Sequence, residues 1–379
     1  MQAERYETVI VGGGQAGLAA GYHLAKRGRS FVILDAGARV GDSWRERWPS
    51  LRLYSPARFD ALPGLKFPAP GSSFPSGNEM ADYLEAYAKR FELPVETGVR
   101  VDELTRDEDG FVVSAGERRF EAENVVVATG VMQRPVTPEL ASELDPSIRQ
   151  LHSNDYRSPA QLQPGKVLVV GAAHSGGDIA YEVAGAGFET ILSGPETGEI
   201  PVPLGSRRFR MSLPVLKLLA TRVLTMSTPI GRKIRTEIRS HGGPLLRVKL
   251  ADLEAAGVER VRNRTVGVED GRPVLDDGRV LDVANVVWCT GFRNDLSWIR
   301  IPFDLDDDGY PEQWRGAVAS VPGLYFVGML FLHSFSSMLI LGAGRDSEQV
   351  VKHLTARAAS LRRAAGSEAV ALVEDGAAA

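Results

Sequence analysis

The sequence predicts an α/β protein built from two Rossmann-like dinucleotide-binding units. Two glycine-rich turns, at 12–17 and 171–176, each follow a short apolar strand and open a helical pattern. Two further apolar strands, ending at 129–130 and 290–291, both finish in Thr-Gly. The first glycines of the two turns lie 159 residues apart, so the chain repeats one supersecondary unit and is not a short-period solenoid.

The first unit occupies residues 7–35 and is complete. An apolar, β-branched strand at 8–11 leads into G-x-G-x-x-G, and a helix follows that we expect to end near Gly28. A second apolar strand, 31–34, delivers Asp35 at its carboxyl end, where an acid accepts hydrogen bonds from a ribose. In such a turn the three glycines permit the tight bend, the approach of a pyrophosphate and close helix–strand packing. The alternative is a glycine-rich turn without a ligand; we expect a nucleotide held by Gly12, Gly14, Gln15, Gly17 and Asp35.

Composition limits the functional class. The 379 residues are enough for two domains, and the net charge of −4 gives no sign of a nucleic acid or membrane partner. The single cysteine, Cys289, excludes an intrachain disulfide, a CxxC redox centre and a cysteine zinc site, and the histidines share no metal-ligand spacing. No apolar stretch is long enough to span a bilayer, and no leader pattern precedes the first strand. We therefore expect a cytoplasmic protein without a resident metal.

A proline-rich loop follows the first unit and leads to a clear helix. Gly41 and Trp44 open this loop, and prolines at six positions between 49 and 75 prevent long regular structure. Trp44 is either a core anchor or a cofactor contact. The segment Asn78–Phe91 has the spacing of an amphipathic helix, and short antiparallel strands should follow it between 94 and 121.

The second unit departs from the dinucleotide fingerprint. Ala173 occupies the place of the middle glycine, where its methyl group should loosen the approach of a pyrophosphate. No acid stands at 193–195, so the 2′-phosphate of NADPH would not be repelled. The basic segment from Arg207 to Arg239 is most simply a set of solvated helix faces, but Arg207 and Arg208 could bind that phosphate.

These features divide the chain. We expect a discontinuous first domain from 1–160 and 292–366, an inserted second domain from 161–291, and a mobile alanine-rich tail at 367–379. Gly328 ends one more apolar strand and returns the chain to the first domain.

With these motifs in place, the chain resembles the class B flavin-dependent monooxygenases, and above all the flavin-containing monooxygenases and their plant YUCCA relatives. The resemblance covers about residues 7–344. It rests on the two glycine turns, Gly41-x-x-Trp44, the Leu51-Arg52-Leu53 loop, Phe74-Pro75 before Tyr83-Leu84-Glu85, His152-Ser153-x-x-Tyr156, Ala128-Thr129-Gly130 and Cys289-Thr290-Gly291.

The resemblance implies FAD in the first domain and NADPH, with NADH as an alternative, in the second. It implies that hydride reduces the flavin, that O₂ forms a flavin C4a-hydroperoxide, and that one oxygen atom is transferred to a small organic substrate. The implied FAD contacts are Gly12, Gly14, Gln15, Gly17, Asp35, Gly41, Trp44, Val101, Thr129, Gly130 and Gly328. The implied NADP contacts are Gly171, His174, Ser175, Gly176, Arg207, Arg208, Thr290 and Gly291.

One position near the flavin differs from the family. Relatives place Asn or Lys about six residues before the counterpart of Tyr83; here Gly77 stands there, and Asn78, one residue later, is the catalytic candidate. His152 and Tyr156 serve either as linker hydrogen bonds or as cofactor contacts. A homodimer is compatible with the sequence.

The sequence is also compatible with two other functions. One is an NAD(P)H reductase or oxidase of the same fold that passes electrons to a quinone, another acceptor or O₂. The other is a nucleotide-binding redox sensor. The cysteine count excludes a dithiol reductase.

Overall fold

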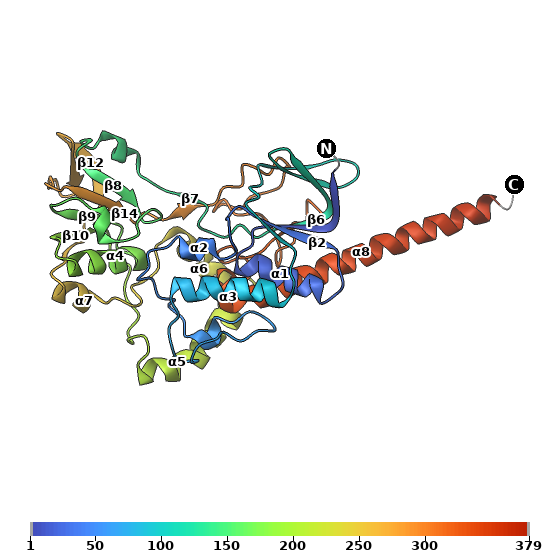
Figure 1. The fold of residues 1–379 in the computed structure, drawn as a ribbon, viewed down its shortest axis with the longest axis horizontal. Coiled ribbons are helices and arrows are strands. Elements are labelled where there is room, and N and C mark those ends of the chain that lie inside the picture. Colours follow the sequence, from blue (N-terminus) through green and yellow to red (C-terminus); the bar gives the residue numbers. More distant parts are fainter. Residues whose placement is uncertain (1–2, 377–379) are drawn as a thin grey trace.

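The computed structural model describes residues 3–376, which form two separate sheets with helices packed around them (Figure 1). The first sheet has seven strands in the order β3-β2-β1-β6-β5-β4, with β16 also paired to β6. The pairs among β1, β2, β3, β6 and β16 are parallel, and β4 and β5 add an antiparallel extension. The bounds are β1 Glu4–Val11, β2 Phe31–Asp35, β3 Val95–Thr97, β4 Glu103–Arg106, β5 Phe111–Ala115, β6 Arg118–Val127 and β16 Leu324–Phe326.

The second sheet is parallel throughout, in the order β11-β10-β9-β14-β8. Its strands are β8 Arg149–His152, β9 Val167–Val170, β10 Thr190–Ser193, β11 Glu259–Val261 and β14 Asn285–Trp288. Two antiparallel pairs lie outside the sheets: β12 Thr265–Glu269 with β13 Arg272–Leu275, and β7 Arg134–Pro135 with β15 Phe292–Arg293. Strand β8 belongs to the second sheet, although the expected division of the chain assigns residues up to 160 to the first domain. We call each sheet with its packed helices the first and the second unit.

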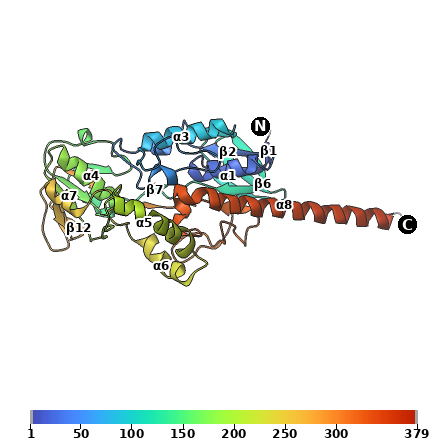
Figure 2. The ribbon, with the colours of Figure 1, turned by 90° about the horizontal axis from the view of Figure 1, so that it is seen from below.

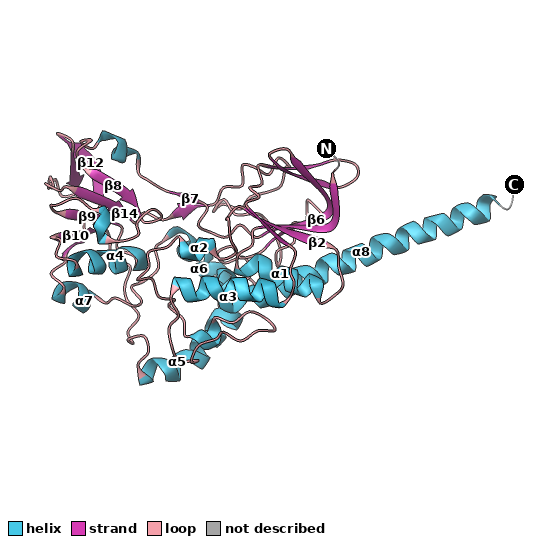
Figure 3. Ribbon diagram, viewed as in Figure 1, coloured by secondary structure: helices cyan, strands magenta, loops and turns pink. Residues whose placement is uncertain are grey.

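Long helices cover one face of the first sheet (Figure 3). Helices α1 Gln15–Ala25, α3 Gly77–Arg90 and α8 Ile340–Gly376 bury their apolar faces there. Helix α3 begins within a residue of the predicted start because the hydroxyl of Ser76 caps it and Glu79 completes a capping box. The loop before it contains only α2 Asp42–Arg45 and the short turn η1 Ala57–Phe59. Three further short turns are η2 Glu139–Glu143, η3 Pro159–Gln161 and η5 Phe335–Met338.

In the second unit, α4 His174–Gly185 and α7 Leu250–Ala255 pack on the sheet. Two side chains from the proline-rich loop, Trp48 and Leu51, are buried in the same core. The loop that follows β2 therefore contributes to both units and fixes one against the other.

A helical segment inserted between β10 and β11 crosses to the first unit (Figure 2). It contains α5 Arg207–Leu218, the π-helical turn η4 Leu219–Val223 and α6 Pro229–Ser240. Backbone hydrogen bonds join its middle to η5 and the loop before it, from Met226 to His333 (2.8 Å) and from Phe335 to Leu224 (2.9 Å). The inserted segment thus begins and ends beside the second sheet but is held on the first unit.

Helix α8 projects far beyond the first unit in Figure 1. It includes residues 367–376 of the expected mobile tail, while 377–379 lie outside the described residues. Among the described helices, none is long and apolar enough to cross a membrane.

Candidate functional site

The first glycine turn lies where β1 ends and α1 begins. Gly12 has a φ of +110°, and a Cβ there would lie 2.5 Å from the carbonyl oxygen of Ala128, at the end of β6. A Cβ at Gly17 would collide with the carbonyl oxygen of Gly12. At Gly14, by contrast, a Cβ would meet no atom within 4 Å. The first and third glycines are therefore required by the fold itself, whereas the second borders open space.

Asp35 turns back onto this glycine turn. One carboxylate oxygen accepts a hydrogen bond from the backbone nitrogen of Gly13 (2.5 Å), and the other accepts one from Gly37 (2.8 Å). These bonds fix the carboxylate beside the start of α1, where no side chain caps the helix. Each oxygen keeps a lone pair with which it could accept a hydroxyl hydrogen bond.

Other expected contacts of the first unit surround the same turn. Gly328, just after β16, has a φ of +76°, and a Cβ there would lie 2.8 Å from the Cβ of Ala16 in α1. Thr129 accepts a hydrogen bond from the side chain of Gln133 (2.8 Å), and Gly130 has a φ of +74°. Gln15 is the first residue of α1. The carboxyl ends of β1, β6 and β16 thus meet at the start of α1.

Three other expected FAD contacts pack against elements other than the first glycine turn. Gly41, with a φ of +91°, precedes α2 and packs on the backbone of Ala81 in α3. Trp44 packs between the cores of the two units, and Val101 packs on the opposite face of the first sheet from α1.

Asn78, the catalytic candidate, is exposed on α3. Gly77 is buried, and a Cβ at this position would lie 3.1 Å from the carbonyl oxygen of Trp44. The side chain of Asn78 therefore does not take the interior place that Gly77 leaves.

The second glycine turn repeats the construction of the first. Gly171 has a φ of +106°, and a Cβ there would collide with the carbonyl oxygen of Cys289, just as Gly12 meets Ala128. A Cβ at Gly176 would collide with the carbonyl oxygen of Gly171, as Gly17 does with Gly12. Ala173 has nearly the same backbone angles as Gly14 (φ −77° and −76°). The two turns are therefore geometrically equivalent.

The second turn differs in being covered. The Cβ of Ala173 would lie 2.7 Å from a Cβ at Gly242, and a Cβ at Gly243 would lie 3.0 Å from the ring of His174. Burial lowers the pKa of His174 despite the nearby carboxylate of Asp178. Ser175 follows in the first turn of α4. The segment after α6 thus packs over the place where the first unit has open space.

A polar cluster lies beside this cover. The hydroxyl of Tyr54, in the loop after β2, donates to Asp178 of α4 (3.0 Å), and a nitrogen of Arg247 lies 3.4 Å from the same oxygen. The ring of His174 packs edge-on against Tyr54. Burial raises the pKa of Asp178, and it raises that of Tyr54 well above the ordinary value. Both units therefore contribute to one desolvated cluster next to the second turn.

Two arginines that local sequence patterns do not single out contact the loop after β10 from strand β11 and the residue just past it. Arg260 of β11 donates to the backbone carbonyls of Leu192, Val261, Gly194 and Pro195, and so fixes this loop. Arg262, just past β11, forms an exposed ion pair of 2.8 Å with Glu196. Thr197 in the same loop donates to the carbonyl of Ala172 in the glycine turn (3.3 Å).

Arg207 and Arg208, the expected phosphate ligands, are exposed at the start of α5. In Figure 1 this helix lies apart from the second sheet. The structure thus brings Arg262 and Glu196, not Arg207 and Arg208, to the carboxyl end of β10. The pairing of β10 with β11 brings Arg262 beside Glu196. The spacing of residues along the sequence does not predict this contact.

The junction of the units contains a partly desolvated cation. Arg47 donates to the side chain of Asn154 (3.3 Å), and its guanidinium lies 5.6 Å from the ring centre of Phe292. Burial and the nearby Arg157 lower its pKa, and no described carboxylate lies within ion-pair distance.

His152 packs edge-on against Phe292, and burial lowers its pKa. Tyr156 donates to Glu182 of α4 (2.9 Å).

The second Thr-Gly ending closes this junction. The hydroxyl of Thr290 donates to the carbonyl of Val136, and Gly291, with a φ of +84°, accepts from the nitrogen of Val136 (3.0 Å). Burial raises the pKa of the Cys289 thiol to about 12, so it stays protonated at neutral pH. The described residues contain no group of His, Cys, Asp or Glu that could hold a metal.

Comparisons with known proteins agree with this construction. The family model described as pyridine nucleotide-disulphide oxidoreductase matches residues 9–199. The chain is 35% identical over 348 residues to a CzcO-like oxidoreductase of Geobacillus kaustophilus, covering 92% of this chain and 98% of that protein. It is 27% identical to the probable indole-3-pyruvate monooxygenase YUCCA3 of Arabidopsis thaliana, covering 92% and 86%. The solved flavin-containing monooxygenase of Stenotrophomonas maltophilia is 28% identical, with a TM-score of 0.74 over 94% of this chain and 99% of that one.

Proposed function

Because this chain belongs to the pyridine nucleotide-disulphide oxidoreductase family, we propose that it is a flavin-dependent monooxygenase that uses NAD(P)H and O₂ to oxygenate a small organic molecule. Homologues of the chain include YUCCA monooxygenases and a bacterial flavin-containing monooxygenase, which supports the oxygenating branch. We further propose that the oxygen atom is transferred through a flavin C4a-hydroperoxide.

The equivalence of the two glycine turns carries the proposal. Each turn places the N-terminus of a helix at the carboxyl ends of parallel strands, where unpaired N–H groups and the helix dipole favour an anion. The open space at Gly14 fits the pyrophosphate of FAD, because it is the place where the fold itself would tolerate a side chain. We therefore assign FAD to the first turn and the nicotinamide coenzyme to the second, where Gly242 and Gly243 would have to move away from Ala173 and His174 before a pyrophosphate could approach.

Named residues perform distinct tasks in this proposal. Asp35, already fixed by Gly13 and Gly37, accepts hydrogen bonds from the ribose of the flavin nucleotide. Gly328 and Thr129 close the site from neighbouring strand ends. The guanidinium of Arg47 at the junction donates to Asn154 but has no carboxylate partner among the described residues, so it can bind a coenzyme phosphate.

When bound, the flavin accepts hydride from the coenzyme and activates O₂, chemistry that the protein side chains do not supply. The protein contributes orientation and exclusion of water. The buried contact between Tyr54 and Asp178 closes the boundary of the units beside the second turn. The Cys289 thiol is protonated, so it does not supply the thiolate nucleophile that would be needed to pass electrons from the flavin to a disulfide substrate.

We further propose a weak preference for NADPH over NADH. Arg262 can bind a 2′-phosphate, but the neighbouring Glu196 competes for its charge and repels the phosphate. A cytoplasmic location and a small-molecule substrate complete the proposal. The single cysteine supports the reducing compartment.

The decisive experiment is anaerobic reduction of the flavin-loaded protein by NADPH, followed by rapid mixing with O₂. A transient absorbance band distinct from oxidised flavin, together with oxygen incorporated into an added substrate, is the expected result. Direct return to oxidised flavin with no oxygenated product under any condition would overturn the monooxygenase proposal and favour a reductase or oxidase.

A further inference from the structure

The inserted helical segment has a charge opposite to that of the whole chain. Residues 201–245 contain nine lysine and arginine side chains and a single acid, Glu237, whereas the chain carries a net charge of −4. Two of the cations, Arg235 and Arg239, are neutralised by acids of the first unit. The positive charge that remains is concentrated on α5, η4 and the start of α6.

Helix α5 presents an apolar stripe to the outside. Phe209 and Leu213, four residues apart, are buried and anchor the helix, and the ring of Phe209 packs near that of Phe74. Met211, Val215 and Leu218 recur at the spacing of a helical face that points away from these anchors. Their exposures are 72%, 58% and 55%. Packing within the chain therefore does not explain this stripe.

Cations flank the stripe on α5 and η4. We call the stripe and its neighbours the α5 surface, which comprises Arg207, Arg208, Arg210, Met211, Val215, Leu216, Lys217, Leu218, Leu219 and Arg222. All of these residues are exposed, and none of the five cations forms an ion pair within the part of the chain that the structure describes. Exposed apolar side chains bordered by unpaired cations are typical of helices that lie on a membrane surface.

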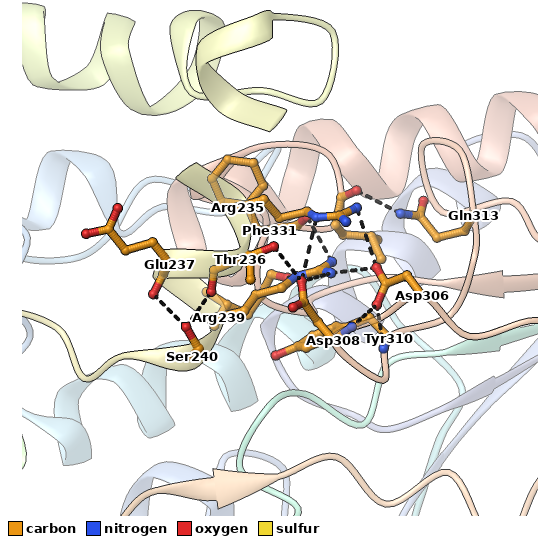
Figure 4. A network of polar contacts seen from close by, with 12 residues as sticks. Arg235, Thr236, Glu237, Arg239, Ser240, Asp306, Asp308, Tyr310, Gln313 and Phe331 are labelled. Carbon is orange, nitrogen blue, oxygen red and sulfur yellow. Dashed lines mark hydrogen bonds and ion pairs between the residues drawn. The ribbon is translucent and has the colours of Figure 1, made fainter. Parts of the chain in front are cut away.

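The segment that carries α5 is anchored to the first unit, as Figure 4 shows for α6. Arg239 is almost fully buried, pairs with Asp306 (2.7 Å) and Asp308 (3.4 Å), and lies over the ring of Tyr310. It also donates to the carbonyls of Leu330 and Phe331 (both 3.3 Å). Because these contacts hold the segment in place, a partner of α5 would meet a prearranged surface.

We propose that the α5 surface docks the protein peripherally on an anionic lipid membrane. The cations would approach the lipid phosphates, and Met211, Val215 and Leu218 would enter the headgroup boundary. A second copy of this chain is a poorer occupant, because a two-fold contact would place the same five cations against each other. The inference departs from the expectation of no membrane partner, which rested on the net charge of the whole chain.

The test uses the full-length, flavin-loaded protein and vesicles of phosphatidylcholine with or without phosphatidylglycerol. We expect cosedimentation with the anionic vesicles only, weakening as salt rises. Because each cation at an anionic surface contributes about 1 kcal/mol, Arg210→Gln with Arg222→Gln should lower the partition coefficient about thirty-fold. Met211→Ser with Val215→Ser should also release the protein.

Matched controls change similar residues elsewhere. Arg100→Gln with Arg264→Gln removes two exposed cations, and Val266→Ser with Leu305→Ser removes two exposed apolar side chains. Both controls should bind vesicles as the unchanged protein does. Equal binding to neutral and anionic vesicles, or no loss in the α5 variants, would overturn the proposal. So would sedimentation showing a dimer that Met211→Ser with Val215→Ser dissociates, if vesicle binding is absent.

Discussion

The phenolic oxygen of Tyr54 lies 3.0 Å from a carboxylate oxygen of Asp178, and this hydrogen bond crosses from the loop after β2 to the helix of the second glycine turn. Asp178 is 2% exposed, so its charge depends on this bond and on Arg247, 3.4 Å away. This one contact therefore both stabilises the folded protein and holds its two units in position relative to each other.

Tyr54→Phe should lower the free energy of unfolding by about 1–3 kcal/mol, because it removes a donor to a buried acceptor. It should also raise the pKa of Asp178 further, since the bond from Tyr54 opposes the effect of burial. Urea denaturation measures the loss. Tyr181→Phe, on the same helix but exposed, is the control and should leave the midpoint unchanged. Equal midpoints for all three proteins would contradict the role of Tyr54.

Gly14→Val should abolish retention of FAD while leaving the fold intact. A Cβ at Gly14 meets no protein atom within 4 Å, so only a ligand would resist the side chain. Flavin absorbance after purification and the thermal unfolding midpoint of flavin-free protein are the two measurements. Gly17→Ala is the contrasting variant, because its methyl group collides with the carbonyl of Gly12 and should destabilise the fold. Full FAD occupancy in Gly14→Val would show that the site is misassigned.

Substitution of Arg262 and substitution of Glu196 should shift the coenzyme preference in opposite directions. Arg262→Gln should shift the ratio of kcat/KM values toward NADH, by about 1.5–3 kcal/mol if the guanidinium binds the 2′-phosphate. Glu196→Gln should shift it toward NADPH, because it removes a repelling charge and frees Arg262. Arg207→Ala and Arg208→Ala are the comparison on α5. If these two change the ratio and Arg262→Gln does not, the phosphate is bound by α5.

Asp60 should make the protein less stable as the pH rises from about 4 to about 7. Burial raises the pKa of its carboxyl from 3.8 to about 7, against a short hydrogen bond from Ser55. The folded state then binds a proton that the unfolded state has released, so stability is greatest below the unfolded pKa and falls through this interval. The loss amounts to about 4 kcal/mol at most, because the pKa rises from 3.8 in the unfolded chain to about 7 in the folded protein.

Asp60→Asn should flatten that dependence, measured as free energy of unfolding in urea at pH 5 and pH 8. Asp307→Asn, which removes an exposed carboxylate, is the control and should retain the slope. A slope in Asp60→Asn equal to that of the unchanged protein would assign the pH dependence to other groups.

The local sequence is sufficient to predict those structural features that depend on residues close together along the chain. The two-unit α/β fold follows from strand, glycine turn and helix in immediate succession, and the structure confirms it. The need for glycine at 12 and 17 could be predicted because both collisions involve backbone that every such turn contains. The capped start of α3 could be predicted for the same reason, from Ser76 and Glu79 three residues apart.

Contacts between distant segments could not be predicted in this way. Glu196 and Arg262 meet only because β10 and β11 pair, and Tyr54 meets Asp178 only because the loop packs on α4. Strand β3, expected in an antiparallel insert, instead extends the parallel part of the sheet beside β2. In each case the tertiary arrangement decides the outcome, and one sequence without its fold contains no local signal for it.

The discontinuity of the first unit also determines the order in which the protein can fold during synthesis. Its core includes residues of α1 and also Val350, Val351 and Leu354 near the far end of the chain. Ser347 donates to the carbonyl of Ala16 (3.0 Å), so the helix of the first glycine turn gains this contact only after more than three hundred further residues have been made. All strands of the second sheet lie between 149 and 288 and leave the ribosome earlier. The unit that begins first is therefore completed last, and truncation near the carboxyl end should expose the first glycine turn while sparing the second sheet.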